Sequence, residues 1–148
     1  IGRAFYGCTS LKSFIFPDNI AYISSDAFYN AGTYEKGVRY VGDCLVYANV
    51  SGDYTIKSGT RFILDEAFKN SLSLNSIKIP SSVIKIGNKA FYTCPIKLVH
   101  CYATTPPVLL TDVFSSNPTC IIPQGTIDEY TKSTWNKAVG RVIEQYIK

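Results

Sequence analysis

Apolar residues recur along the chain in a spacing that predicts short strands. An apolar residue is followed by a second after three positions and by a third two positions later, as in Leu11, Phe14 and Phe16 and in Leu74, Ile77 and Ile79. The last two residues of each set lie two positions apart, as residues on one face of a strand do. Such a strand has one apolar face that needs a partner to cover it.

The dipeptide Ala-Phe gives the chain a period of 23 residues. Its successive occurrences are 23, 40 and 23 positions apart, and 40 is one period plus 17 further residues. They are Ala4-Phe5, Ala27-Phe28, Ala67-Phe68 and Ala90-Phe91. A fixed period of this length is typical of a solenoid, in which neighbouring units cover each other's apolar faces.

Stacking is expected to join equivalent residues into continuous rows along a parallel strand ladder. The expected rows are Phe14, Tyr54 and Ile77; Phe16, Ile56 and Ile79; Ile23, Ile63 and Ile86; and Phe28, Phe68 and Phe91. A unit of 23 residues leaves little room for a long helix, so each Ala-Phe segment is expected to form a tight turn or short helical piece opposite the strand. The predicted fold class is therefore mainly β with short helical pieces, a short solenoid.

The 17 additional residues predict a β-hairpin inserted at about 32–52. Residues 38–41 and 44–48 have strand character and enclose Gly42-Asp43, which suits a type II′ turn. The hairpin either extends and shields the sheet or protrudes as a contact surface. In the second case its aromatic and basic residues would form that surface: Tyr34, Arg39, Tyr40 and Tyr47.

Beyond Tyr102 the period ends, and residues 103–148 are expected to cap the solenoid. Residues 119–123 predict one more strand, and the T-x-x-E sequence from Thr126 to Glu129 predicts a capping box on a helix that ends near Lys132. Trp135 is expected to plug the last open row of the core. The chain is thus predicted to be one domain, 1–148, with repeats over about 1–102.

The repeated unit also resembles a known family. The sequences Ile86-Gly87-Asn88-Lys89-Ala90-Phe91 and Ile79-Pro80-Ser81-Ser82-Val83 are similar to those of the BspA-type leucine-rich repeat, over about 1–31 and 53–102. That family occurs on bacterial cell surfaces, so the resemblance implies a leucine-rich-repeat solenoid and an extracellular or cell-surface location. The segment 103–148 is similar to the one that follows such repeats in gut-type bacterial surface proteins.

The composition offers little chemistry for catalysis. The chain has 148 residues, 46% of them hydrophobic, and a net charge of +4 that is spread thinly, so neither nucleic-acid binding nor membrane insertion is expected. His100 is the one histidine, and its neighbour Cys101 is expected to point to the opposite strand face. No metal-ligand spacing or nucleotide-binding motif occurs. We therefore predict no enzyme activity, no cofactor and no metal.

The five cysteines are expected to be free thiols, because a core of this size needs no disulfide. Four equivalent positions of the repeat hold small residues: Cys8, Ala31, Ser71 and Cys94. A position that accepts Cys, Ala and Ser selects for small size in a packed row, which favours buried structural thiols over reactive ones.

Outward strand positions are the second candidate for a contact surface. They are Ser13, Ile15, Asp53, Thr55, Ser76 and Lys78, continued by Val99 and Cys101. The predicted function is non-catalytic recognition of a host or bacterial surface protein or glycan, as in adhesion. The alternatives are a structural spacer and a targeting module of a larger surface protein or enzyme. Because no cap precedes Ile1, the N-terminal end is also expected to be open to weak self-association.

Overall fold

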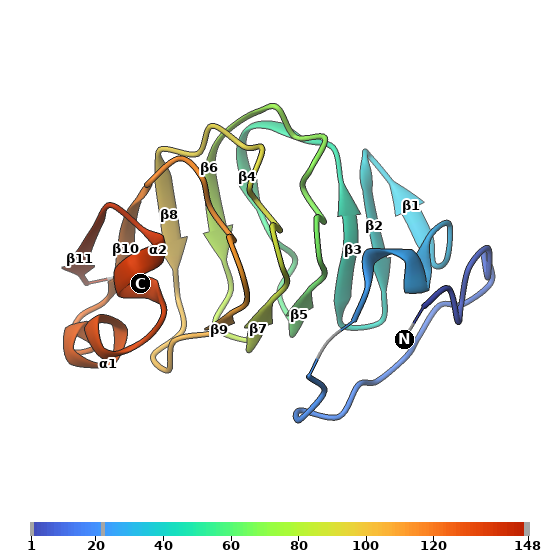
Figure 1. Ribbon diagram of the computed structural model, residues 1–148, viewed down its shortest axis with the longest axis horizontal. Coiled ribbons are helices and arrows are strands. Elements are labelled where there is room, and N and C mark those ends of the chain that lie inside the picture. The colour runs from blue at the N-terminus through green and yellow to red at the C-terminus, as the bar shows by residue number, and fades with distance from the viewer. Residues whose placement is uncertain (1, 22, 147–148) are drawn as a thin grey trace.

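The computed structural model describes residues 2–21 and 23–146, which form a curved solenoid of two sheets (Figure 1). Within these residues the first sheet has six strands, in the order β1 (Thr33–Glu35), β2 (Val38–Val41), β3 (Cys44–Ala48), β5 (Phe62–Ile63), β7 (Lys85–Ile86) and β9 (Val108–Leu109). The second sheet has five, in the order β11 (Arg141–Gln145), β10 (Thr119–Pro123), β8 (Leu98–Cys101), β6 (Ser73–Ile79) and β4 (Ser51–Thr55).

The 23-residue period produces the predicted parallel ladder. In the first sheet Ile63 pairs with Ile86 and Ile86 pairs with Leu109. All neighbouring strands of the second sheet are parallel. Ala27-Phe28 lies in the 3₁₀ helix η1 (Ser25–Phe28), and the other Ala-Phe segments form turns. The rings of Phe68 and Phe91 lie 4.6 Å apart. The prediction of a mainly β solenoid with short helical pieces is confirmed.

Side chains also join one unit to the next at intervals of 23 residues. The Asn88 backbone N–H donates to Asp65 Oδ1 at 2.7 Å, and Asn88 Oδ1 accepts from the Thr111 backbone N–H at 3.1 Å. In the row of small residues, the Ser71 hydroxyl donates to the Ala48 carbonyl at 3.0 Å, again 23 positions away, and the Cys94 thiol donates to the Phe68 carbonyl at 3.2 Å, 26 positions away. The repeat thus places polar as well as apolar groups in register.

The insertion forms the expected hairpin. Strands β2 and β3 are antiparallel, with Val41 paired to Cys44 across Gly42-Asp43. Gly42 has a φ of 56° while φ at Asp43 is not positive, which is the sign pattern of a type II′ turn. Strand β1 pairs antiparallel with β2, and β3 then pairs parallel with β5, so the hairpin extends the first sheet.

The two units before the insertion depart from the predicted rows. Residues 10–17 form no strand. The backbone of Phe14 lies against the turn at Gly42, whereas the prediction placed Phe14 beside Tyr54. Phe16 contacts Phe28 and Phe62 in a separate core formed by the N-terminal part of the chain and the hairpin. Leu45 of β3 lies beside Ile63, where Ile23 was expected. The physical reason is that the hairpin occupies the place on the ladder that the earlier units would need.

Phe28 therefore belongs to a different aromatic stack from the one predicted. It stacks on Phe5, with ring centroids 5.0 Å apart and planes 9° from parallel. The C-terminal stack runs separately from Phe68 through Phe91 to Phe114. The N-terminal core and the C-terminal core are distinct clusters of buried residues.

The C-terminal segment continues both ladders and then closes them. Strands β9 and β10 add further strands beyond Tyr102, and β11 pairs with β10. Trp135, in α2 (Trp135–Ala138), is fully buried, as predicted, and its indole N–H donates to the Pro107 carbonyl at 2.8 Å. Phe114 lies between the ring of Phe91, at 5.3 Å, and that of Trp135, at 6.1 Å.

The predicted capping box is not formed. The helix exists as α1 (Ile127–Lys132), but the Thr126 hydroxyl donates to the Pro123 carbonyl and caps no helical N–H. The Ile127 N–H donates instead to Glu144 Oε1 at 2.6 Å. Glu144 lies in β11, so a distant carboxylate satisfies the helix terminus that a local side chain was expected to satisfy.

All five cysteines are free in the structure, and four of them are buried. Burial raises the pKa of Cys94 to about 11 and raises the pKa of Cys44, Cys101 and Cys120 as well. Cys8 is exposed, so the expectation of a buried small-residue row is wrong at that position. It lies at the outer end of the described solenoid.

Candidate functional site

The predicted strand face is present on β4 and β6 for four of its six residues. Asp53 pairs with Ser76 and Thr55 pairs with Lys78, and the Ser76 hydroxyl donates to Asp53 Oδ1 at 2.7 Å. The four side chains line a shallow, open hollow. Ser13 and Ile15 are not part of it, because their segment forms no strand; both are exposed elsewhere, Ile15 at 82%.

The register of β8 is the reverse of the predicted one. Val99 and Cys101 are fully buried, and His100 lies on the outer face beside Lys78. Partial burial and the nearby Lys78 ammonium lower the pKa of His100. Cys101 points into the core, where its sulfur accepts a hydrogen bond from the Tyr130 hydroxyl at 3.1 Å. His100 and Cys101 diverge, so they form no nucleophile and base pair.

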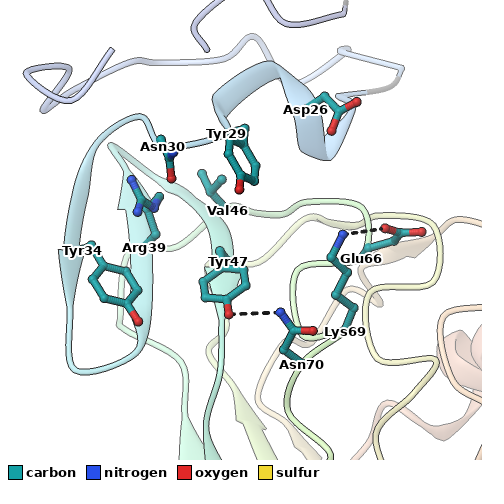
Figure 2. Close-up of a pocket in the computed structure, with 10 residues that line it drawn as sticks. All are labelled: Asp26, Tyr29, Asn30, Tyr34, Arg39, Val46, Tyr47, Glu66, Lys69 and Asn70. Carbon is teal, nitrogen blue, oxygen red and sulfur yellow. Dashed lines mark hydrogen bonds and ion pairs between the residues drawn. The ribbon is translucent and has the colours of Figure 1, made fainter. Parts of the chain in front are cut away.

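Three of the four predicted hairpin residues meet in one cleft, which we call the hairpin cleft (Figure 2). Tyr34 and Tyr47 lie with ring centroids 6.4 Å apart, and the Arg39 guanidinium lies 5.2 Å from the Tyr34 ring centroid. The cleft has a volume of about 460 Å³, within the range of roughly 300–1,000 Å³ typical of small-molecule sites.

A β-bulge directs Tyr47 into this cleft. Arg39 pairs with Tyr47 but the next residue, Tyr40, pairs with Leu45, which leaves Val46 without a partner. A bulge of this kind interrupts the alternation of side chains, so Val46 and Tyr47 both line the cleft although they are adjacent in the chain. With strict alternation along β3, Tyr47 would share the face of Leu45 and not that of Val46.

Tyr40, the fourth predicted residue, lies on the other side of the hairpin. Its hydroxyl is 3.5 Å from the Tyr54 hydroxyl and accepts a hydrogen bond from the Lys57 backbone N–H at 3.2 Å. Tyr40 therefore connects the hairpin to β4 and lines a separate hollow.

Sequence reasoning missed the residues that form the walls of the cleft. Each wall is an Ala-Phe segment, one from the unit before the insertion and one from the unit after it. The equivalent pairs are Asp26 and Glu66, Tyr29 and Lys69, and Asn30 and Asn70. In regular units such turns stack directly, through the bond from the Phe68 N–H to the Ala90 carbonyl. At the insertion the Ala48 N–H bonds the Ala67 carbonyl instead, so the hairpin stands between the two turns.

Two polar contacts involve the wall after the insertion. The Asn70 amide donates to the Tyr47 hydroxyl at 3.1 Å, and the Lys69 ammonium lies 3.3 Å from Glu66 Oε2. The period itself was the signal for these residues, because the sequences Asp-Ala-Phe-Tyr-Asn and Glu-Ala-Phe-Lys-Asn flank the insertion in the same phase.

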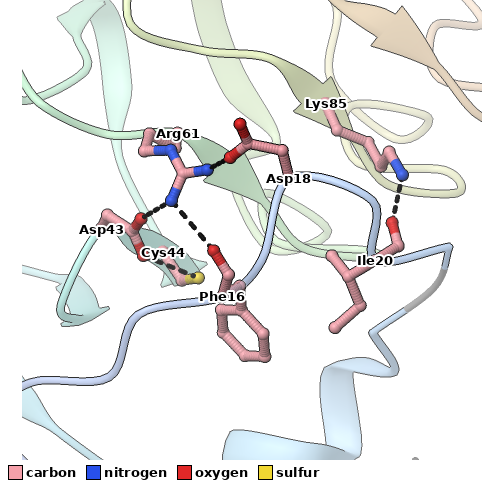
Figure 3. A network of polar contacts seen from close by, with 7 residues as sticks. All are labelled: Phe16, Asp18, Ile20, Asp43, Cys44, Arg61 and Lys85. Carbon is pink, nitrogen blue, oxygen red and sulfur yellow. Dashed lines mark hydrogen bonds and ion pairs between the residues drawn. The ribbon is translucent and has the colours of Figure 1, made fainter.

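A second polar cluster, formed around Arg61, is structural (Figure 3). The Arg61 guanidinium donates to the Phe16 carbonyl at 3.0 Å and to Asp43 Oδ2 at 2.8 Å, and it also pairs with Asp18. The Lys85 ammonium donates to the Ile20 carbonyl. These contacts attach residues 16–20 to the ladder.

Within residues 2–21 and 23–146, no group of three or more His, Cys, Asp or Glu side chains is arranged to hold a metal ion. In that same described part, no helix has the length and apolar character to cross a membrane.

Stacked 23-residue units with parallel ladders and an aromatic row define a leucine-rich-repeat solenoid. A family model described as the BspA type leucine rich repeat region matches the chain in six copies, over residues 2–97 and 43–118. The chain belongs to this family, which indicates a surface repeat module; its members are typically surface-associated. A search of curated proteins found no match.

Proposed function

We propose that this chain is a non-catalytic recognition module of an extracellular or cell-surface protein, and that it binds a surface protein or glycan in adhesion. The observation that carries the proposal is the hairpin cleft, in which Tyr34, Arg39 and Tyr47 lie together. Tyr and Arg are enriched where proteins bind partners, because each offers a large contact area together with hydrogen-bonding groups.

Folding does not account for the exposed tyrosines that line the hairpin cleft. Tyr34 is 55% exposed and Tyr29 is 53% exposed, so neither contributes much buried area to a core. The pairing of β1 with β2 and of β2 with β3 places the hairpin side chains beside the cleft before any ligand binds, and such preorganisation lowers the entropic cost of binding.

The strand face favours the second candidate function, a structural spacer or targeting module. Asp53, Thr55, Ser76 and Lys78 make that face polar, and the hollow that they line is wide open; ordinary solvated strand residues have the same polar character.

A binding screen tests the proposal directly. The wild-type chain is applied to arrays of glycans and extracellular-matrix proteins, next to a Tyr34→Ala/Tyr47→Ala double variant and a Thr55→Ala/Lys78→Ala double variant. We expect binding that the tyrosine variant loses and the strand-face variant keeps. Binding lost only in the strand-face variant would move the site to β4 and β6, and an absence of binding on all arrays would favour the spacer.

A further inference from the structure

The walls of the hairpin cleft present the same polar groups twice. Asp26 and Asn30 come from the turn before the insertion, and Glu66 and Asn70 occupy the equivalent positions in the turn after it. Figure 2 shows the two turns bordering the cleft from two sides, with Tyr47 between them. A carboxylate and an amide on each wall supply several acceptors together with N–H donors.

The floor of the cleft is aromatic. Tyr34 and Tyr47 present their rings at 6.4 Å and an angle of 40°, and Tyr29 adds a third ring from the first wall. Each ring has two flat apolar faces and a hydroxyl edge. One face of Tyr29 stacks on Tyr6 at 5.3 Å and one face of Tyr34 lies under Arg39, so a ligand would use the opposite face of each. A ligand suited to this floor has a flat apolar side and a polar edge.

The charges within the cleft balance one another. Two carboxylates, Asp26 and Glu66, are matched by two cations, Arg39 and Lys69. Lys69 already pairs with Glu66, and the Arg39 guanidinium lies over the Tyr34 ring. A strongly charged ligand would gain attraction from one pair of groups and repulsion from the other.

We infer that the hairpin cleft binds a neutral saccharide, and this inference rests on the proposed function. The C–H face of a sugar ring would stack on Tyr34 and Tyr47, while its hydroxyl groups, which both donate and accept, would bond the carboxylates and amides of the two walls. The volume of about 460 Å³ and the open shape of the cleft suit a short stretch of sugar rings.

Titrations followed by amide NMR shifts of the whole chain test the inference. The probes are neutral hexasaccharides of glucose, mannose and xylose, an acidic hexasaccharide of galacturonate, and every further neutral oligosaccharide that binds on the arrays. We expect a neutral probe to shift amides around Asn30, Tyr47 and Asn70. Its affinity should change less than about twofold between about 0.05 M and 0.5 M salt, because only charged ligands are screened.

Substitutions show which side chains contribute to saccharide affinity. Tyr34→Ala and Tyr47→Ala should each weaken saccharide binding at least about tenfold, as for an aromatic residue at the centre of a contact. Tyr92→Ala is the matched control: Tyr92 is an exposed tyrosine with a cation, Lys89, over its ring, but it lies outside the cleft, and its removal should leave affinity unchanged. An unaltered thermal midpoint for Tyr34→Ala would show that the lost binding is not lost folding.

The remaining outcomes separate the two proposals. Stronger binding of the acidic probe, or binding to a matrix protein that survives removal of its glycans yet is lost in Tyr47→Ala, would overturn the saccharide inference and leave the recognition module standing. Binding of sugars that Thr55→Ala/Lys78→Ala abolishes would overturn the inference by placing the site elsewhere. No binding to any neutral saccharide or protein would overturn both.

Discussion

The two ends of this solenoid use the same repeated sequence in different ways. From β4 to β9, each unit adds one strand to each sheet and bonds its neighbour through its backbone. Before the hairpin, the described residues of two units with the same Ala-Phe sequence contribute no strand to either ladder, and residues 16–20 are attached through Arg61 and Lys85. A repeat motif therefore encodes a strand only when the place beside the existing ladder is free, and here the hairpin occupies that place.

The largest expected effect is on the free energy of unfolding, when one buried aromatic ring is removed from each region. Phe68→Ala and Phe28→Ala each delete a fully buried ring, which typically costs about 3–5 kcal/mol. We expect Phe68→Ala to lower the urea midpoint of the whole chain, whereas Phe28→Ala should loosen mainly the N-terminal core. Fluorescence of Trp135, the one tryptophan, reports the C-terminal core, and circular dichroism reports both.

The control for this pair is Tyr92→Ala, a partly exposed ring whose loss should change stability by less than about 0.5 kcal/mol. If Phe28→Ala shifts the Trp135 midpoint as far as Phe68→Ala does, the two regions unfold as one cooperative unit and the comparison between them fails.

The attachment of the N-terminal segment can be broken next. Arg61→Met removes bonds to the Phe16 carbonyl and to Asp43, whose side chain is only 15% exposed. Leaving such partly buried groups unpaired should cost about 1–3 kcal/mol. Faster amide hydrogen exchange in residues 2–21, with exchange in β6 and β8 unchanged, is the expected readout.

Lys69→Met is the matched substitution, because Lys69 and Glu66 form a pair in which both side chains are about half exposed. Such surface pairs contribute about 0–1 kcal/mol. Equal effects of Arg61→Met and Lys69→Met would mean that the Arg61 cluster does not hold the segment in place.

Thiol reactivity compares the two cores without mutation. Cys8 is exposed and should react at once, while the buried thiols react only when the structure opens, since burial and raised pKa values suppress their thiolates. If the N-terminal core opens first, Cys44 should react at least about tenfold faster than Cys94, Cys101 and Cys120, a difference of about 1.4 kcal/mol. Mass spectrometry of labelled peptides gives the order.

Urea-denatured, unreduced protein should expose five thiols in the same assay. Fewer than five would reveal a disulfide, and Cys44 reacting last would reverse the proposed order of opening.

The smallest expected effect is a pH dependence from the C-terminal region. The lowered pKa of His100 means that the unfolded chain binds this proton at a higher pH than the folded chain does. Stability should therefore decline as pH falls through about 6.5, the ordinary histidine value, and level off below the folded pKa. The difference between wild type and His100→Gln isolates this contribution, and identical pH profiles would contradict it.

Much of the fold could be predicted because the period is visible in the sequence. The pairing of Ile63 with Ile86 follows from a spacing of 23, and the hairpin follows from Gly42-Asp43 between two apolar segments. Trp135 could be assigned to the core because a solenoid needs a large residue to cover its last row.

The register of β8 could not be predicted by the same rule. Ile77 pairs with Val99, which is 22 positions further on, because the unit that begins at Ala90 is one residue shorter between Cys94 and Ile96. A shift of one residue exchanges the two faces of a strand. Val99 and Cys101 are therefore inside and His100 is outside, the reverse of what the constant period predicts.

The hairpin cleft was predictable only in part. Tyr34, Arg39 and Tyr47 could be chosen by residue type, but the bulge at Val46, which separates Tyr47 from Tyr40, has no distinct signature in the sequence. The helix cap from Glu144 was missed for a related reason, because the carboxylate that bonds Ile127 is 17 residues away from it.

The bonds that join Asp65 to Asn88 and Asn88 to Thr111 have a consequence for how such a chain can change in length. Both connect residues 23 positions apart, so duplication or loss of one complete unit would leave every later contact with an equivalent partner. A change of another length has to be absorbed within its own unit, as the 22-residue step from Ile77 to Val99 is, since Ile86 still pairs with Leu109 at 23. The regular part of the molecule can thus evolve by recombination of whole units. The hairpin cleft depends on the single insertion between two units, so it would have to be inherited intact.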